Sequence, residues 1–254
     1  MNVDLLGIPA LVNYDAAVDW PARLEREGSF LRRALAGAPS QRVIDLGSGT
    51  GEHARWLAAQ GCTVVGIEGV RERWEVAKRL AVRNVEHLIG DFGAVEQMVR
   101  GQFGAAICLG NTLPVLLGVE ALSRMLIGLR RRFLPGGVFV AQLLNYEALL
   151  RRQVRELPER RLYREDGELV FRCALDLRAD GVVEVTESVL HREAGAEGEG
   201  RVVHRRHRYL QGWRCEELLI LLDVARFRTV EVFGGFAGEP FDLAASEELL
   251  VIAT

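Results

Sequence analysis

The sequence predicts an α/β fold in which a doubly wound, mostly parallel sheet is covered by helices on both faces. Short apolar runs alternate with helical patterns from residue 41 to about residue 150. The runs RVIDL and TVVGIE are apolar at successive positions, which is typical of strands buried on both faces. The glycine-rich stretch GSGTG joins the first run to a helical pattern, as in the strand–turn–helix units of parallel sheets.

The elements of this core follow one another in order. The segment VDWPARLEREGSFLRRAL predicts a helix that begins near Pro21 and either packs on the sheet or forms a lid across the strand ends. Gly61 ends the next expected helix as its C-terminal cap. Strands are expected at residues 42–46, 63–68, 85–90, 105–110 and 137–144, and helices between them at residues 53–61, 71–83 and 121–133.

After residue 151 the pattern changes to alternating apolar and polar positions, which predicts antiparallel strands. Residues 168–193 are predicted to form two strands joined by a turn, and residues 201–210 a third. A helix from Trp213 and two strands, 229–236 and 248–254, complete the chain. We expect a single domain with an N-terminal helical lid (1–40), a ligand-binding core (41–150), an antiparallel insertion (151–211), and a C-terminal helix with the last two strands (212–254).

The composition argues against several classes of function. The 254 residues are 49% hydrophobic and 26% charged with a formal net charge of −3, so bulk charge favours neither nucleic acid nor an anionic membrane as a partner. The four cysteines lack the spacing of a zinc site or a disulfide framework. The N-terminal segment lacks a basic leader, and no apolar run is long enough to span a bilayer. We expect a soluble, cytoplasmic protein without a bound metal, whose oligomeric state the sequence does not give.

The glycine turn in VIDLGSGTGEHA raises the question of its ligand. A phosphate-binding P-loop requires GxxxxGK[ST], which is absent here. A dinucleotide fingerprint requires a glycine where this chain has Glu52, and an acid in the first helical turn disfavours a phosphate. Asp45, two residues before the first glycine, is suited to position the turn or to bind an ammonium group of a ligand. The residues of this turn expected at the ligand are Asp45, Gly47, Ser48, Gly49 and Gly51.

Acidic residues also follow the next two expected strands. Glu68 ends TVVGIE and precedes Gly69, and a carboxylate there accepts hydrogen bonds from both hydroxyls of a ribose. Asp91 and Phe92 follow the third strand, and an acid beside an aromatic ring suits an adenine, as acceptor for its amine and as a stacking surface. The alternative for this pair is an N-cap aspartate followed by a core phenylalanine. The end of the second strand therefore fits a ligand that carries adenosine, whereas position alone favours the N-cap alternative for Asp91 and Phe92.

Taken in order, the motifs VIDLGSGTG, TVVGIEGV, GDF, FLPGGVFVAQ and RFRTVEVFGG resemble those of class I S-adenosylmethionine-dependent methyltransferases. The resemblance extends from about Tyr14 to the C-terminus. It implies a seven-stranded Rossmann-like sheet with S-adenosylmethionine as the cofactor. It also answers the question of the glycine turn, because this ligand has an adenosine and no phosphate.

Two segments, CLGNTLPVL and LLNYEALL, resemble more narrowly the glycine and sarcosine N-methyltransferase-like group. This likeness implies that Leu109 touches the cofactor and that Asn111 contacts the substrate. The further residues that the likeness places at the site are Tyr14 and Arg23 toward the cofactor, and Asn145 and Tyr146 toward the substrate.

The chain departs from that group where the substrate carboxylate is bound. An Arg before Asn-Tyr clamps the carboxylate in the group, and this chain has Leu144 there, which removes a charge-assisted bidentate contact. Val115 likewise replaces a His that related sequences carry. These departures argue against glycine or sarcosine as the acceptor. We expect N-methylation of a less charged small molecule.

Methyl transfer from a sulfonium depends on alignment and exclusion of water, so it requires neither a nucleophilic residue nor a metal. The sequence identifies no general base: His53 suits local packing better than catalysis. Residues 204–208, HRRHR, alternate across both faces of a strand and suit a solvated edge better than an RNA-binding patch. Two alternatives stay open, a protein that binds S-adenosylmethionine without catalysis and a nicotinamide (NAD)-dependent oxidoreductase.

Overall fold

The structure, a computed structural model, describes residues 17–178, 180–196 and 198–254. The chain divides into two compact units, which we describe separately. The core unit comprises residues 20–148 and 213–254, and the insertion unit comprises residues 149–212 with the N-terminal segment, of which residues 17–19 are described. Within the described part, no helix has the length and apolar character needed to cross a membrane.

A seven-stranded sheet forms the centre of the core unit, in the order β10-β11-β5-β4-β1-β2-β3. In this order, the neighbouring strands β5, β4, β1, β2 and β3 pair in parallel, and β11 is antiparallel to both β5 and β10. The mostly parallel sheet with a final antiparallel pair is therefore confirmed. Strand order reverses between β1 and β4, which is where open α/β sheets bind ligands. The strands are β1 (Arg42–Leu46), β2 (Thr63–Glu68), β3 (Val85–Ile89), β4 (Phe103–Cys108), β5 (Phe133–Leu144), β10 (Val230–Phe233) and β11 (Glu248–Ala253).

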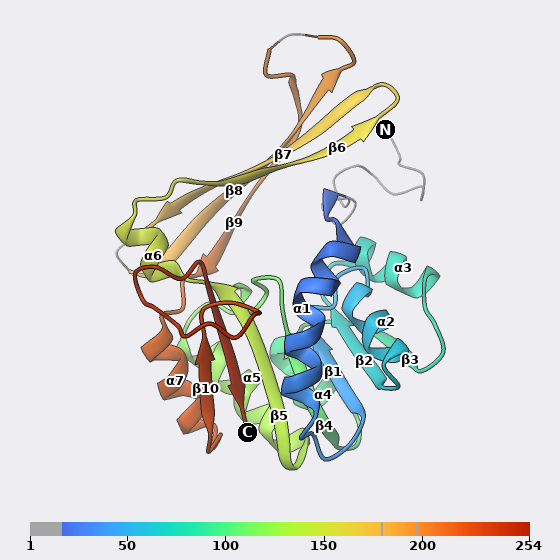
Figure 1. The fold of residues 1–254 in the computed structure, drawn as a ribbon, viewed down its shortest axis with the longest axis vertical. Helices are drawn as coiled ribbons and strands as arrows, with labels where there is room; N and C mark the ends of the chain where they lie inside the picture. The colour runs from blue at the N-terminus through green and yellow to red at the C-terminus, as the bar shows by residue number, and fades with distance from the viewer. Residues whose placement is uncertain (1–16, 179, 197) are drawn as a thin grey trace. The chain divides into compact units, whose positions relative to one another are not determined.

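Helices cover both faces of this sheet, as the doubly wound class requires (Figure 1). One face packs against α1 and α2, and the other packs against α4, α5 and α7. Each face of the sheet carries its own hydrophobic cluster, and successive strand residues point to opposite faces. Val43 lies in the cluster with α1 and α2, and Ile44 lies in the cluster with α4, α5 and α7. The helices of the core unit are α1 (Trp20–Leu35), α2 (Glu52–Ala59), α3 (Arg71–Arg79), α4 (Val95–Met98), α5 (Val119–Arg132) and α7 (Cys215–Val224), with short 3₁₀ turns η2 (Phe92–Ala94) and η3 (Leu113–Val115). Helix α6 (Tyr146–Arg151) begins in the core unit and ends in the insertion unit.

The N-terminal helix α1 is part of the cover of the sheet. Phe30 and Leu31 are fully buried and pack in the cluster that α1 shares with α2 and the sheet. Figure 1 shows α1 beside α2, and its contacts include β5. The second half of α1 therefore packs on the sheet, which was one of the two alternatives for this segment. The first half carries Arg23, Arg26 and Glu27, whose contacts are described with the site below.

The insertion unit holds a four-stranded antiparallel sheet in the order β6-β7-β8-β9. Three of these strands were expected, and β6 was missed because ELPERRLYR has a proline and little alternation. Its pairing with β7 is irregular between Leu157 and Arg160, on either side of Pro158. At the other edge of the sheet, Arg206 and Arg208 of β9 pair with Glu187, as suits a charged edge strand. The strands are β6 (Glu156–Arg164), β7 (Gly167–Leu177), β8 (Val182–Glu193) and β9 (Arg201–Gln211).

A glycine in β4 fixes how closely the segment before β1 approaches the sheet. A Cβ atom at Gly104 would lie 2.0 Å from the backbone carbonyl oxygen of Ser40. We predict that Gly104→Ala lowers the free energy of unfolding by about 3 kcal/mol, the upper part of the usual range for overpacking. Gly37→Ala is the control, because its Cβ would meet no atom within 4 Å. Urea denaturation measures both variants, and equal stabilities would contradict the close approach.

Candidate functional site

Three glycines shape the turn between β1 and α2. Gly47, Gly49 and Gly51 have φ angles of 70°, 58° and 86°, in the left-handed region that other residues rarely adopt. A Cβ atom at Gly47 would lie 2.2 Å from Cγ2 of Thr112, so this turn approaches the segment after β4 closely. The sequence therefore uses glycine here for both backbone conformation and space.

Glu68 holds the glycine turn from the end of β2. Its Oε2 accepts a hydrogen bond from the Gly49 N–H at 2.8 Å, and its Oε1 accepts one from the Val70 N–H at 2.7 Å. The Glu68 side chain is buried, and Gly69 is the residue between Glu68 and Val70. The sequence predicted a ribose contact for Glu68 and gave no sign of this bracing role. Each carboxylate oxygen accepts more than one hydrogen bond, so the two roles are compatible.

Two polar side chains beside the turn are buried without a protein partner for one atom each. These atoms are Oδ2 of Asp45 and Oγ of Ser48. Burial, helped by the charge of Glu68 and opposed by His53, raises the pKa of Asp45 to about 6. A buried carboxylate oxygen without a donor is costly, and an ammonium group of a ligand is a donor that would satisfy it. The residues at this strand end therefore fit a ligand with a cationic group.

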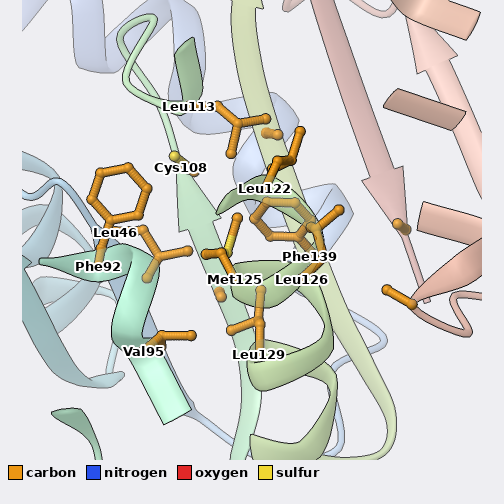
Figure 2. Close-up of a cluster of buried hydrophobic side chains, with 14 of the residues drawn as sticks. Leu46, Phe92, Val95, Cys108, Leu113, Leu122, Met125, Leu126, Leu129 and Phe139 are labelled. Carbon is orange, nitrogen blue, oxygen red and sulfur yellow. The ribbon is translucent and has the colours of Figure 1, made fainter. Parts of the chain in front are cut away.

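Asp91 and Phe92 take the arrangement that the sequence offered as the alternative. Oδ1 of Asp91 accepts a hydrogen bond from the Gly93 N–H at 2.7 Å and caps η2, while the side chain stays exposed. Phe92 is 5% exposed, and Figure 2 shows its ring in the core near Leu46, above Val95. The ring is thus packed inside the core and is not displayed as a stacking surface.

The segment after β4 brings together two of the predicted substrate residues. Nδ2 of Asn111 donates to the Tyr146 hydroxyl at 2.9 Å, and Oδ1 of Asn111 accepts from the Leu144 N–H at 3.0 Å. Leu109 is buried in the cluster on the α1 face of the sheet. The backbone N–H groups of Gly110 and Asn111 both donate to Gln142, a residue that the sequence analysis did not single out.

Asn145 is engaged inside the protein. Its Nδ2 lies 3.4, 3.2 and 3.0 Å from the carbonyl oxygens of Asp242, Leu243 and Ser246, and its Oδ1 accepts from the Ala148 N–H at 3.2 Å. The residue is 2% exposed. These contacts make Asn145 an anchor for the loop before β11. The predicted contact with a substrate is not what its amide does in this structure.

A buried charged cluster joins α1 to the first turn of α2. Oε1 of Glu27 accepts from Nε of Arg23 at 2.8 Å, and Oε2 lies 2.7 Å from Nε2 of His53. Burial raises the pKa of Glu27, but His53 and Arg23 outweigh it and hold the pKa below its ordinary value. An ionised carboxylate only accepts hydrogen bonds, so the His53 ring donates to it. His53 therefore packs and pairs locally, as expected.

Glu27 was missed by the sequence analysis, although it is four residues after Arg23 on a helix and therefore on the same side. Arg23 itself lies at the segment after β4, because a Cβ atom at Gly110 would be 3.3 Å from its Nη2. Tyr14, the other candidate from the N-terminal segment, lies outside the described residues. No group of three His, Cys, Asp or Glu side chains suited to a metal occurs in the part of the chain that the structure describes.

Comparison with known proteins finds similarity to methyltransferases. Residues 43–137 match the family described as a methyltransferase domain. Over 141 residues the chain is 31% identical to a glycine/sarcosine N-methyltransferase of Parasynechococcus marenigrum (strain WH8102), covering 54% of this chain and 50% of that protein. The chain thus spans about half the length of the curated relatives it matches.

Solved structures share the fold over nearly the whole chain. An S-adenosylmethionine-dependent methyltransferase from Clostridium acetobutylicum superposes with a TM-score of 0.75 at 13% identity, covering 94% of this chain and 93% of that chain. A sugar N-methyltransferase from Streptoalloteichus sp. ATCC 53650 gives a TM-score of 0.73 at 19% identity, covering 99% and 95% of the two chains. At these identities the likeness establishes the fold.

The Glu27 cluster predicts a large loss of stability on truncation. Glu27→Ala should lower the free energy of unfolding by about 3 kcal/mol or more, because it leaves Arg23 and His53 without their buried partner. Glu25→Ala, at an exposed position of the same helix, should change it by less than about 0.5 kcal/mol. Denaturant unfolding compares the two variants. Similar losses in both would show that the buried pairing contributes nothing specific.

The raised pKa of Asp45 predicts a pH-dependent effect of Asp45→Asn. The folded protein keeps the Asp45 proton up to a pH of about 6, whereas the unfolded chain loses it near the ordinary pKa of 3.8. Stability from this group is therefore full below the unfolded pKa and is lost as the pH rises through the folded pKa. At pH 8 Asp45→Asn should be more stable than the wild type by up to about 3 kcal/mol.

The measurement is the difference in unfolding free energy between the wild type and Asp45→Asn from pH 4 to pH 8, about two units on either side of the raised pKa. Asp223→Asn, at an exposed position of α7, is the control and should show no such trend. A difference that does not change with pH would contradict the burial of an ionisable Asp45.

Proposed function

Because residues 43–137 match a methyltransferase domain and the sheet has the fold of the class I S-adenosylmethionine-dependent methyltransferases, we propose that this protein methylates the amine of a small molecule with S-adenosylmethionine as the methyl donor. One observation supports the donor most directly. Two buried carboxylates, Asp45 and Glu68, flank a turn of three glycines at the point where the strand order reverses. That site suits a cationic ligand with a ribose and without a phosphate.

The residues that would hold the cofactor come from four strand ends. Glu68 would bind the ribose, and the second oxygen of Asp91 would accept from the adenine amine. Asp45 would accept from the ammonium group of the methionine part, with Arg23 nearby at the segment after β4. The set proposed at the cofactor is Asp45, Gly47, Ser48, Gly49, Gly51, Glu68, Gly69, Asp91 and Leu109, with Arg23 from α1.

When bound, S-adenosylmethionine supplies a methyl group on a sulfonium, which an amine lone pair can displace. The side chains of this protein then have to bind, orient and exclude water, and alignment of two reactants supplies roughly 7–11 kcal/mol of barrier reduction. Asn111 and Tyr146 are the residues proposed to face the acceptor. Their mutual hydrogen bond fixes both side chains before an acceptor binds.

Several observations favour an amine that lacks a free α-carboxylate. Leu144 stands where the resemblance to the glycine enzymes calls for an arginine, and its side chain offers no charge-assisted bond. Val115 is 42% exposed and adds apolar surface in η3. The similar proteins include a glycine/sarcosine N-methyltransferase and a sugar N-methyltransferase, and a sugar amine has no α-carboxylate. We therefore propose an uncharged or weakly charged small-molecule amine as the acceptor.

Calorimetry with S-adenosylmethionine, S-adenosylhomocysteine and NAD tests the donor. Glu68→Gln should weaken binding of both sulfur nucleosides by about 10- to 100-fold, because it removes the charge from hydrogen bonds to the ribose and sets an amide donor against the N–H of Gly49 or Val70. Glu75→Gln, at an exposed position of α3, is the control and should bind like the wild type. Binding of NAD in place of the sulfur nucleosides would overturn the proposal in favour of an oxidoreductase.

The acceptor is tested by transfer of labelled methyl groups to a panel of small amines. We expect turnover with amines that lack a carboxylate and little turnover with glycine. Tight binding of S-adenosylmethionine with no turnover across the panel would instead favour a binding protein without catalysis.

A further inference from the structure

The segment after β4 has an unusual backbone. Gly110 and Asn111 are consecutive residues with φ angles of 70° and 58°, and a left-handed conformation at a residue other than glycine is uncommon. Their two N–H groups point to one atom, Oε1 of Gln142, at 2.8 and 3.2 Å. Successive N–H groups that converge in this way form a small concavity that binds an oxygen atom. Here the oxygen is supplied by the protein itself.

Gln142 is well placed for this contact. It lies on β5 and is 5% exposed, on the same face of the sheet as Val140, two residues earlier. Its other amide atom, Nε2, donates to Oε1 of Glu248 on the neighbouring strand β11 at 3.0 Å. In the register of these strands Gln142 is opposite Leu250, so Glu248 is the diagonal neighbour on the same face. The Gln142 amide therefore has one orientation, with its oxygen toward the turn.

Glu248 is itself held by α1. Its Oε2 lies 3.4 Å from Nη1 of Arg26, and its side chain is 16% exposed. Burial and the nearby Glu27 raise the pKa of Glu248, while Arg26, Arg23 and the Gln142 bond oppose this. The result is a continuous series of contacts from Arg26 of α1 through Glu248 and Gln142 to the turn at Asn111.

We propose that Gln142 is a positioning residue for the methyl acceptor, which acts by holding the Gly110–Asn111 turn. This inference rests on the proposed function, because it gives the turn its role in binding the acceptor. The turn presents Asn111, whose side chain bonds to the Leu144 N–H and the Tyr146 hydroxyl. If the turn were released, Asn111 would lose its left-handed backbone conformation and its hydrogen bond to the Tyr146 hydroxyl.

The chemistry of position 142 requires an amide. A leucine there would leave two N–H groups without an acceptor, and the cost of this could unfold the protein. A glutamate would accept from both N–H groups but would face the carboxylate of Glu248, and two carboxylates at this distance repel each other unless they share a proton. The position therefore needs an acceptor on one side and a donor on the other, which only an amide of this size supplies.

The experiment exchanges the two side chains. Gln142→Glu alone creates the carboxylate pair, and Glu248→Gln alone removes the charge but keeps a hydrogen-bonding pair. The double variant Gln142→Glu with Glu248→Gln restores both bonds, because the new amide at position 248 donates to the new carboxylate at position 142 and can still accept from Arg26. It also keeps the net charge and the side-chain volumes of the wild type, and each variant is checked for cooperative thermal unfolding.

Two readouts are taken at pH 8. The first is kcat/KM for the acceptor, which should fall by about tenfold or more in Gln142→Glu, as expected when a bond to a buried charged pair is lost, and return to within about threefold of the wild type in the double variant. The second is hydrogen exchange of the segment around residues 109–112, where protection should be lost in the single variant and regained in the double. Affinity for S-adenosylhomocysteine should stay within about threefold throughout.

The pH profile separates positioning from general damage. The deficit of Gln142→Glu relative to the wild type should shrink as the pH is lowered, because a shared proton restores a donor between the two carboxyl groups. A Gln142→Glu variant that matches the wild type, or a folded double variant that is not rescued, would overturn the proposal. If the wild type methylates no amine, the proposed function fails, and the exchange measurement still decides whether Gln142 holds the turn.

Discussion

The carboxylate of Glu68 is the group on which the ligand edge of the sheet depends. Glycines give the turn after β1 the backbone freedom to approach a ligand, but they also leave it without side chains that could fix it. Glu68 supplies the missing constraint, since one oxygen binds the Gly49 N–H and the other binds the Val70 N–H. The close approach of Gly47 to Thr112 joins this turn to the segment after β4. The ends of β1, β2 and β4 are thereby held as one edge.

Strand alternation explains why the polar groups of the site gather on one face. The hydrophobic cluster on the α1 face includes Val43, Val140 and Leu250. Asp45 lies two residues after Val43 on β1, and Gln142 lies two residues after Val140 on β5, so both point to this same face. Near the ends of the strands the cluster thus gives way to a polar layer. Helix α1 matches this change, because Phe30 and Leu31 of its second half are buried in the cluster, whereas Arg23, Arg26 and Glu27 of its first half meet the polar layer.

The sequence was sufficient for the fold and for the half of the site that is local in the chain. The glycine turn directly follows one predicted strand and Glu68 ends the next, so their place at this edge of the sheet could be derived from strand order alone. The contacts of Gln142 and the contact between Glu27 and His53 could not, because they join positions 32, 106 and 26 residues apart without any local pattern. Phe92 shows the opposite problem, since the position after a strand suits both a ligand and the core, and only packing decides between them.

The two halves of the site are braced by groups of different charge, and the proposed reaction gives a reason. Carboxylates brace the donor half, where a cationic cofactor is stabilised by negative charge. The neutral amides of Gln142 and Asn111 brace the acceptor half. An amine must lose its proton before it can attack a methyl group, and a carboxylate in direct contact with it, at the position of Asn111, would stabilise the protonated form instead. Gln142 lies between the carboxylate of Glu248 and the turn, and it positions Asn111 by accepting from the two N–H groups of that turn.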